Sequence, residues 1–487
     1  MDVSKAHKRI LVREEERGLL LFGLGGRLYH YVSCHFGATF SAYWWGRAGA
    51  ALHRTLHRLL RSWHLGFLYV DDWLWRLCKA VAPLQATLLA LALCALGCPL
   101  SWHKLRLGDE LEWIGWRFNF AALQVSLPGD KVERLCEFLA AVATSRGRME
   151  RAAVRKGAGL LQWVCQAMLP LRPWMAEFYA ALANAAPTNV MLSRCQVELI
   201  VAALSPDFRV LRRVGGSPVR PGMRLVDMSR GKPVCPQHML AHCSGAGKTW
   251  TKWTDPESKF VHVNGELKSL AARWRAALLR GRWRAPLMAP RPAPGKAAAD
   301  ACAAGDRVGL GGWFTLHVDD AIPGAVWWFA LEFSVGELPA EWGMRPDAQK
   351  DISAYELLAQ GILLVCRARM LPPCRMQLEL RSAVDNTAAE AVGNKLFTTA
   401  APMKHVARSI ALWAAALRVV PDLQHIAGDR NDLADGLSRG HSSALSVVSA
   451  EQRVPVSLLD FVACRGSSKL CPPEAKAPAA LTPLLAQ

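Results

Sequence analysis

The sequence predicts a multidomain protein that combines α+β and α/β folds. Its length of 487 residues fits two to four domains of ordinary size. A hydrophobic content of 52% with 20% charged residues is typical of globular chains that bury cores. Apolar residues alternate along the chain between the period of strands and that of helices, so we expect both kinds of element.

Charge and cysteine usage narrow the class of protein. Lysine and arginine outnumber aspartate and glutamate by 59 to 40, which favours a polyanionic partner such as nucleic acid, with a solvated basic surface as the alternative. The N-terminus lacks the apolar core of a secretory signal, and 14 cysteines without repeated spacing indicate reduced thiols. We therefore expect an intracellular protein, nuclear or cytoplasmic. The apolar run 84–100 is short for a transmembrane span and predicts a buried core helix, so no membrane partner is expected.

The first half of the chain divides into a mixed region and a helical one. Within 1–126, the residue patterns predict strands at 28–32, 67–70 and 112–120 and a helix at 41–63. Amphipathic periodicity then predicts a helical region over 127–205.

The second half divides into a connection, a compact domain and a tail. Residues 206–295 are rich in Pro, Gly and basic side chains and predict a connecting region that ends in a Pro-rich linker. Residues 296–440 predict an α/β domain with a central sheet, with strands at 308–318, 325–335 and 376–384 and a helix at 353–370. The tail 441–487 is expected to be disordered.

A pair of carboxylates lies in the apolar stretch FLYVDDWLW. Asp71 and Asp72 would share the turn of a hairpin, where ionised pairs among apolar neighbours need a compensating charge. Hard cations such as Mg²⁺ supply it, and two metals held by aspartates serve nucleotidyl transfer. Asp2 offers a third carboxylate from a neighbouring strand. Alone, the Y-x-D-D string also fits a calcium-binding turn or a solvated hairpin.

The flanking motifs occur in a specific order. Asp2 is followed by CHFGATFSAYWW, YVDD, LGCPLSWHK and EWIGW, a series that resembles the palm of reverse transcriptases, closest to gypsy-like and DIRS-like retroelements. The resemblance implies that Asp2, Asp71 and Asp72 bind two Mg²⁺ ions, or Mn²⁺, and that Lys104 acts near the triphosphate. It also implies that template, primer and nucleotide are contacted by His7, Phe36, Gly37, Tyr69, Trp113, Gly115 and Trp116. The alternatives are a surface lysine and ordinary core aromatics.

The resemblance also carries an expectation about completeness. Such enzymes have a fingers region before the first catalytic aspartate, which is residue 2 here. The sequence is therefore interpreted as N-terminally truncated or as part of a larger polyprotein, and we expect inefficient polymerisation by this chain alone. His7 stands where the family usually has an aromatic residue, which leaves discrimination against ribonucleotides open.

Four further acids recur in the second half of the chain. Single acids at such positions usually cap helices or face solvent. The set in this order, ending in NDLADGLSR, resembles the type-1 ribonuclease H domain that follows the polymerase in retroelements. The resemblance implies two Mg²⁺ ions that cut the RNA strand of a hybrid. Their ligands would be Asp300, Glu356, Asp385 and Asp435.

Two neighbours of these acids have implied roles. His425, ten residues before Asp435, would assist proton transfer, with a surface-loop histidine as the alternative. Asn386 would contact the RNA strand, with a structural cap as the alternative.

Three other motifs are set aside. Asp319 and Asp320 are interpreted as hairpin-loop acids, and the stretch 243–250 lacks the first glycine of a phosphate-binding loop. The spacing of Cys235, His238, His242 and Cys243 fits no zinc knuckle, so a basic arm facing nucleic acid is favoured.

These observations predict an RNA-directed DNA polymerase with ribonuclease H activity. Its partners would be an RNA template, a DNA primer, the RNA–DNA hybrid and dNTPs. The alternative is a decayed retroelement copy that acts as a non-catalytic, basic nucleic-acid-binding protein. All seven metal-ligand positions still hold Asp or Glu, which argues against long neutral decay.

Overall fold

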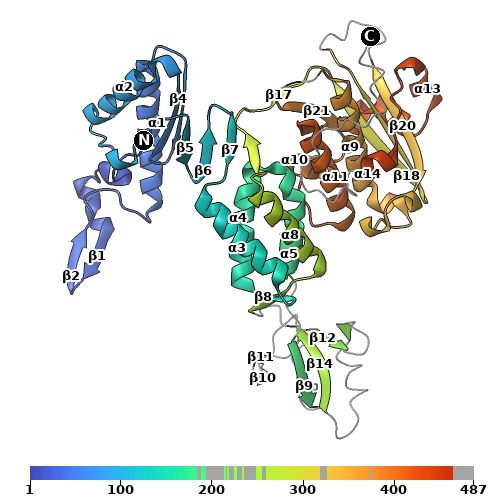
Figure 1. Ribbon diagram of the computed structural model, residues 1–487, viewed down its shortest axis with the longest axis horizontal. Helices are drawn as coiled ribbons and strands as arrows, with labels where there is room; N and C mark the ends of the chain where they lie inside the picture. The colour runs from blue at the N-terminus through green and yellow to red at the C-terminus, as the bar shows by residue number, and fades with distance from the viewer. Residues whose placement is uncertain are drawn as a thin grey trace. The chain divides into compact units, whose positions relative to one another are not determined.

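The computed structural model describes residues 1–183, 259–317, 326–372, 374 and 376–463, together with the backbone of six strands between 188 and 254. The chain divides into two compact units, Met1–Pro128 and Gly129–Gln487. Figure 1 shows the first unit in blue to cyan. Most of 206–258, which the sequence predicts to be a basic connection, lies outside the described residues.

The first unit consists of short antiparallel strands and two long helices. β1 pairs with β2, β3 with β4, and β5, β6 and β7 form a meander. Its elements are β1 (Leu21–Leu24), β2 (Arg27–His30), α1 (Thr39–Leu59), β3 (His64–Tyr69), β4 (Asp72–Leu77), α2 (Ala82–Ala95), β5 (Glu110–Trp113), β6 (Trp116–Asn119) and β7 (Gln124–Ser126).

Helices α1 and α2 build the core of this unit. Trp45 and Leu56 of α1 pack with Leu89 of α2 and Trp73 of β4, all almost fully buried. The expectation that 84–100 forms a buried helix is only half right, because α2 leaves leucines of one face, such as Leu91, exposed to solvent. No helix in the described ranges is both long and apolar enough to cross a bilayer.

The N-terminal residues pair with two other segments of this unit, one on each side. Asp2 forms an isolated bridge with Asp72, and Val3 forms one with Leu100. The backbone N–H of Val3 donates to the carbonyl of Asp71 at 3.1 Å, and Ser101 N–H donates to the carbonyl of Asp2 at 2.9 Å. Backbone hydrogen bonds therefore hold Asp2 and Val3 from two sides, and they place Asp2 beside the β3–β4 turn.

The second unit begins with a helical layer, consisting of α3 (Gly129–Thr144), α4 (Arg151–Ala167), α5 (Met175–Ala183) and α8 (Gly265–Leu279). Helix α8, which the sequence assigns to the connection, packs on α3. Its Trp274 lies against Phe178 of α5, with ring centroids 5.8 Å apart. The short strands β8 (Arg148–Glu150) and β15 (Phe260–His262) pair antiparallel at one end of this layer.

Between the helices, six strands have a described backbone. Strands β13, β12, β14 and β9 form a sheet in that order, and β10 pairs with β11. Their bounds are β9 (Thr188–Ser193), β10 (Arg213–Val214), β11 (Ser217–Pro218), β12 (Arg224–Asp227), β13 (Pro233–Val234) and β14 (Lys248–Thr254).

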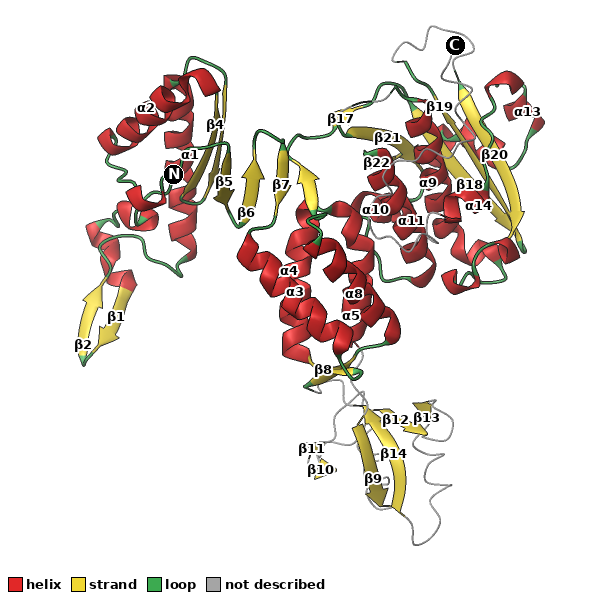
Figure 2. Cartoon of the chain, in the orientation of Figure 1, coloured by secondary structure: helices red, strands yellow, loops and turns green. Residues whose placement is uncertain are grey.

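A central sheet follows, in the order β20–β19–β18–β21–β22. The first three strands are antiparallel, and β21 runs parallel to both β18 and β22. Helices α9, α10 and α11 lie together against it (Figure 2). The strands of this sheet are β17 (Arg291–Pro292), β18 (Ala297–Ala304), β19 (Arg307–Phe314), β20 (Trp327–Ser334), β21 (Leu378–Val384) and β22 (Val419–His425); the short strand β16 (Arg284–Pro286) is not part of it. The helices are α9 (Ile352–Met370), α10 (Thr387–Lys395), α11 (Ala401–Leu417), α12 (Asp432–Ser438), α13 (Ser442–Leu445) and α14 (Leu458–Ala463).

The strand β18 is absent from the sequence-based expectation, which starts this domain's strands at 308. Its sequence AAADACAA has low intrinsic strand propensity, because alanine gains little on an exposed pleated surface. Here the strand lies in the middle of the sheet under α9, where Ala298 and Ala299 are buried. Tertiary burial therefore overrides local propensity at this strand.

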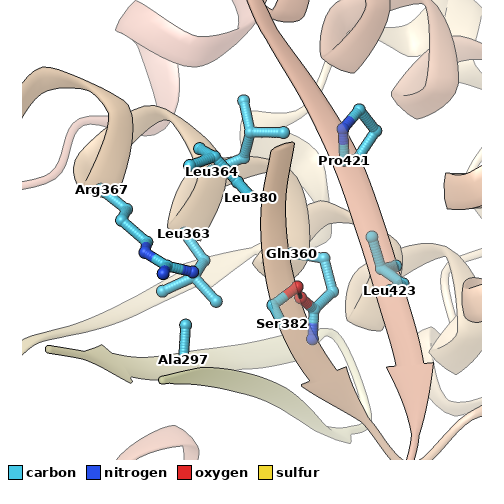
Figure 3. A pocket seen from close by; sticks show the side chains of 9 residues that line it. All are labelled: Ala297, Gln360, Leu363, Leu364, Arg367, Leu380, Ser382, Pro421 and Leu423. Atoms are coloured by element: carbon cyan, nitrogen blue, oxygen red, sulfur yellow. Dashed lines mark hydrogen bonds between the residues drawn. The ribbon is translucent and has the colours of Figure 1, made fainter. Parts of the chain in front are cut away.

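The Pro-rich stretch 285–298 is attached to the sheet, unlike the free linker that the sequence predicts. β17 pairs parallel with β21, and the buried guanidinium of Arg367 donates to the carbonyls of Pro294 and Gly295 at 2.6 and 3.0 Å. Burial lowers the pKa of Arg367 to about 10. Figure 3 shows Arg367 and Gln360 around an interior cavity of about 10 Å³, which is room for one water molecule.

Part of the expected tail is ordered. Residues 441–463 form α13, a 3₁₀ turn and α14, whose Phe461 is buried. The indole of Trp328 donates to the carbonyl of Ser449 at 2.7 Å, and Val454 N–H donates to the carbonyl of Trp328. Apolar residues at 458 and 461 therefore extend the sheet domain beyond 440, while residues after 463 lie outside the described chain.

Candidate functional site

The first carboxylate cluster, defined as Asp2, Asp71 and Asp72, lies at the turn between β3 and β4. Val70, just before the pair, has φ +54°, a strained conformation for a β-branched residue. The indole of Trp45 donates to the Val70 carbonyl at 2.7 Å. The turn is therefore fixed by the core below it, as expected of a site that must hold its side chains in place.

A lysine supplies the cation of the first cluster. Asp2, only 8% exposed, forms an ion pair with Lys104 and accepts from the hydroxyl of Ser101 at 3.1 Å. The hydrogen bond with Asp2 raises the pKa of Lys104. Burial, together with the charges of Asp2 and Asp71, raises the pKa of Asp72. The predicted cationic residue is thus adjacent to the acids and neutralises one of them.

The cluster opens into a cleft of about 650 Å³ lined by Asp2, Asp72, Lys104 and Trp113, among others. Trp113 precedes the turn of the β5–β6 hairpin. The two turn residues, Ile114 and Gly115, have φ values of +42° and +78°, as the tight two-residue turns of hairpins require. Trp113 therefore lines the same cleft as Asp2 and Asp72.

The other predicted contact residues of the first unit differ in exposure. Phe36 and Tyr69 are 72% and 58% exposed, and Gly37 has φ +94°. His7 is buried, with Nδ1 bonded to the carbonyl of Ser41 at 3.1 Å and its ring against Phe36. Trp116 is also buried.

The second cluster, defined as Asp300, Glu356 and Asp385, gathers three carboxylates from three elements. One oxygen from each lies within 4.8 Å of the others. The parallel register that pairs Ala298 of β18 with Ala383 of β21 places Asp300 and Asp385, two residues further on, side by side.

Gln360 holds the helix that carries Glu356 over these strands. Its amide donates to the carbonyls of Ala299 and Ala383 at 3.0 and 2.7 Å. Glu356 lies one helical turn earlier on the same face of α9. Sequence reasoning missed Gln360, although a polar residue four positions after an acid in a largely apolar helix is a signal that could have found it.

Asp435 approaches the cluster on α12, which packs directly on the backbone of β19. A Cβ atom at Gly309 or Gly311 would lie 2.1 Å from the carbonyl oxygen or 2.2 Å from the nitrogen of Ser438, so only glycine fits. Asp435 is outside the 4.8 Å group, and its carboxylate accepts from Arg439 Nε at 2.8 Å.

No lysine or arginine forms an ion pair with the second cluster in the part of the chain that the structure describes; Arg439, paired with Asp435, acts on Asp300 only through its charge. Burial and the charge of Asp385 raise the pKa of Glu356 to about 8 and that of Asp300 to about 7. Glu356 Oε2 and Asp385 Oδ1 are buried and have no hydrogen-bond partner among the described residues. Buried carboxylate oxygens without partners fit a hard divalent cation such as Mg²⁺.

Two predicted neighbours lie at the rim of this cluster. His425 is exposed at the end of β22, and its Nε2 donates to the backbone carbonyl of Asp385 at 3.2 Å. Asn386 caps α10, because its side-chain oxygen accepts from the N–H groups of Ala388 and Ala389. The capping alternative therefore describes the geometry of Asn386.

The motifs set aside in the sequence cannot be placed. Asp319, Asp320, Cys235, His238, His242, Cys243 and the side chains of 243–250 lie outside the described residues.

Comparisons with known proteins give distant structural similarities. No protein-family model and no curated protein matches the sequence. Among solved structures, the chain is similar to the foamy viral protease-reverse transcriptase in complexes with double-stranded DNA. One, a dRH form, has TM-score 0.35, 11% identity and coverage of 87% of this chain and 56% of that one. Another has TM-score 0.34, 12% identity and coverage of 87% and 66%. A complex of the same protein with an RNA/DNA hybrid has TM-score 0.30, 13% identity and coverage of 92% and 67%. The chain thus spans 56% of the first of these proteins.

Proposed function

We propose that the second unit hydrolyses the RNA strand of an RNA–DNA hybrid with two Mg²⁺ ions, or Mn²⁺. Asp300, Glu356 and Asp385 would hold the ions, with Asp435 completing the set. The observation that carries this proposal is the convergence of three carboxylates, two of them buried, none of which forms an ion pair with a lysine or arginine in the described chain. The strand order β20–β19–β18–β21–β22 with α9 across it supports the ribonuclease H-like domain expected from the sequence.

The residues of the second cluster have separable tasks in this reaction. Divalent ions bound there supply an activated water and stabilise the leaving 3′-oxygen. Asp300 and Asp385 are fixed by the β18–β21 register, and Glu356 by the contacts of Gln360. His425 is tethered to the Asp385 backbone but exposed, so it can exchange protons between the cluster and solvent. Arg439 holds Asp435 at the edge of the cluster.

For the first unit we propose the metal-dependent nucleotidyl transfer that the palm resemblance implies, with RNA template, DNA primer and dNTPs as partners. Asp2 and Asp72 line a cleft of about 650 Å³, which is large enough for a nucleotide and so supports this role. Lys104 pairs with Asp2 in the described conformation, so a metal ion at Asp2 would compete with this lysine. The gypsy-like or DIRS-like origin belongs to the same proposal.

The test uses the full chain and a hybrid whose RNA strand carries a 5′ label. Helices α5 and α11 share buried ion pairs, so an isolated sheet domain would expose charges that are now paired. We expect RNA cleavage in Mg²⁺ that EDTA stops, and no cleavage of duplex DNA. Binding to the hybrid with no cleavage in Mg²⁺ or Mn²⁺ would favour the non-catalytic alternative instead.

A further inference from the structure

Three histidines of the first unit form a cluster that neither proposed active site uses. His53 and His57 lie four residues apart on α1, and His64 begins β3. His57 Nε2 is 3.0 Å from His53 Nε2, and His57 Nδ1 is 2.8 Å from His64 Nε2. All three residues are partly exposed, although His53 Nδ1 is buried.

Hydrogen bonding fixes which nitrogens carry lone pairs. His64 Nδ1 contacts the carbonyl of Ser62 at 2.7 Å, and because a carbonyl only accepts, the ring must donate from Nδ1. His64 Nε2 is then an acceptor, so His57 donates to it from Nδ1. A neutral His57 therefore keeps its lone pair on Nε2, directed at His53 Nε2.

We propose that His53 and His57 chelate a divalent transition-metal ion through their Nε2 atoms, with His64 as a positioning residue. The two nitrogens are 3.0 Å apart, close to the roughly 3.3 Å that a tetrahedral ion with metal–nitrogen bonds near 2.0 Å requires. Once His53 carries its proton on Nδ1, both Nε2 lone pairs are available, and the ion would lie off the line between the two nitrogens, facing both.

The ligand chemistry selects the class of ion. Imidazole nitrogen suits Zn²⁺, Ni²⁺ and Cu²⁺, whereas Mg²⁺ prefers oxygen ligands, so this site differs from both carboxylate clusters. The inference does not depend on either proposed reaction, because neither carboxylate cluster contributes a ligand.

Binding is tested with Ni²⁺ on the full chain by calorimetry, in excess Mg²⁺ so that carboxylate sites are occupied. We expect His57→Ala to abolish Ni²⁺ binding at this site. The control His30→Ala, at an exposed histidine of β2, should leave the site intact. Removal of the positioning residue in His64→Ala should weaken binding about tenfold, and His64→Gln, which keeps an acceptor, should recover most of it. Ni²⁺ affinity unchanged in a folded His57→Ala chain would overturn the proposal.

A second measurement needs no variant and therefore no assumption about folding. Diethyl pyrocarbonate modifies free imidazoles, and mass spectrometry locates the modified residues. We expect Ni²⁺ to protect His53 and His57 while His30 stays reactive. Equal modification of His53 and His57 with and without Ni²⁺ would contradict chelation.

Discussion

The first carboxylate cluster forms an ion pair with a lysine, whereas no lysine or arginine among the described residues is ion-paired with the second. In the first, Lys104 pairs with the nearly buried Asp2. In the second, Glu356 and Asp300 are similarly buried, but the charge they meet is that of Asp385, and their pKa values rise to about 8 and about 7. Similar burial therefore gives one acid, Asp2, that the chain pairs with a cation, and two acids, Asp300 and Glu356, that it leaves without an ion pair.

A buried acid outside both clusters serves as a reference for this difference. Glu177 of α5 is 5% exposed, like Asp300, but it pairs with Lys404 and Arg408 of α11 at 3.0 and 2.6 Å. Burial alone would raise the pKa of Glu177, yet the two cations outweigh it and hold that pKa below its usual value. The counter-charge, and not burial, therefore separates a structural acid from a candidate metal ligand.

The largest expected effect comes from removing one charge of the second cluster. Asp385→Asn deletes a ligand that lies beside Asp300 and within 4.8 Å of Glu356. Loss of several kcal/mol of metal-dependent stabilisation predicts a fall in hybrid cleavage of about 1000-fold or more. The rate is measured with labelled hybrid under single-turnover conditions.

The matched control for this substitution is Asp306→Asn, an exposed acid in the turn between β18 and β19. We expect its cleavage rate to stay within about twofold of the unmutated chain, since it contacts no cluster residue. Equal losses in both variants would mean that the hybrid cleavage does not come from the second cluster.

The second prediction removes the counter-charge from the reference acid. Arg408 is 4% exposed and pairs with Glu177 and Glu266. Arg408→Ala therefore leaves the buried carboxylate of Glu177 with Lys404 as its remaining ion-pair partner. Breaking such a pair is expected to lower the free energy of unfolding by about 3–5 kcal/mol, as measured by urea denaturation. Arg381→Ala, at an exposed pair with Asp422, is the control and should cost less than about 1 kcal/mol. If both variants lowered the free energy of unfolding by similar amounts, burial would not decide how much an ion pair contributes to stability.

The sequence indicated the acids of the second cluster but not the strand and the packing contacts that bring them together. Asp300, Glu356 and Asp385 were recognisable because carboxylates in a fixed order resemble a known domain. The strand that carries Asp300 was missed, because its alanines show no strand propensity and gain their place only by packing under α9. Gly309 and Gly311 lie inside the predicted strand 308–318, and nothing in the sequence indicated that they let α12 touch β19.

The same limit applies to charge in the first unit. Lys104 was expected near the triphosphate, yet its pairing with Asp2 depends on a fold contact across about a hundred residues. Sequence spacing cannot give that distance, since it arises from the bridges of Asp2 and Val3 with β4 and Leu100.

The third prediction concerns pH in the absence of divalent ions. The native pKa of Glu356, about 8, exceeds the ordinary value of 4.5, so the native state binds more protons between these limits. Its contribution to stability is complete below about pH 4.5 and is lost as the pH rises towards 8. Glu356→Gln removes this loss and should stabilise the EDTA-treated chain by about 1–3 kcal/mol at pH 8, with little effect at pH 4.5.

Thermal and urea unfolding at several pH values measure this effect. Glu451→Gln, at an exposed position, is the control and should show no such pH dependence. Added Mg²⁺ should stabilise the unmutated chain more at pH 8 than at pH 6, because the ion competes with protons for the same oxygens. A Glu356→Gln chain with an unchanged pH profile would contradict the uncompensated burial of Glu356.

The smallest expected effect comes from making the first cluster resemble the second. Lys104→Met keeps an aliphatic side chain but removes the charge that neutralises Asp2. The lysine is 57% exposed, so solvent screens its field, and the expected gain in Mn²⁺ affinity is about tenfold or less. Mn²⁺ binding is measured by electron paramagnetic resonance in an Asp385→Asn background, which weakens the second cluster.

Lys104→Arg, which keeps the charge, should bind Mn²⁺ no better than the background chain. If Lys104→Met also binds no better, a feature other than the internal cation must keep metal from Asp2, and the contrast between the two clusters would then rest on geometry alone.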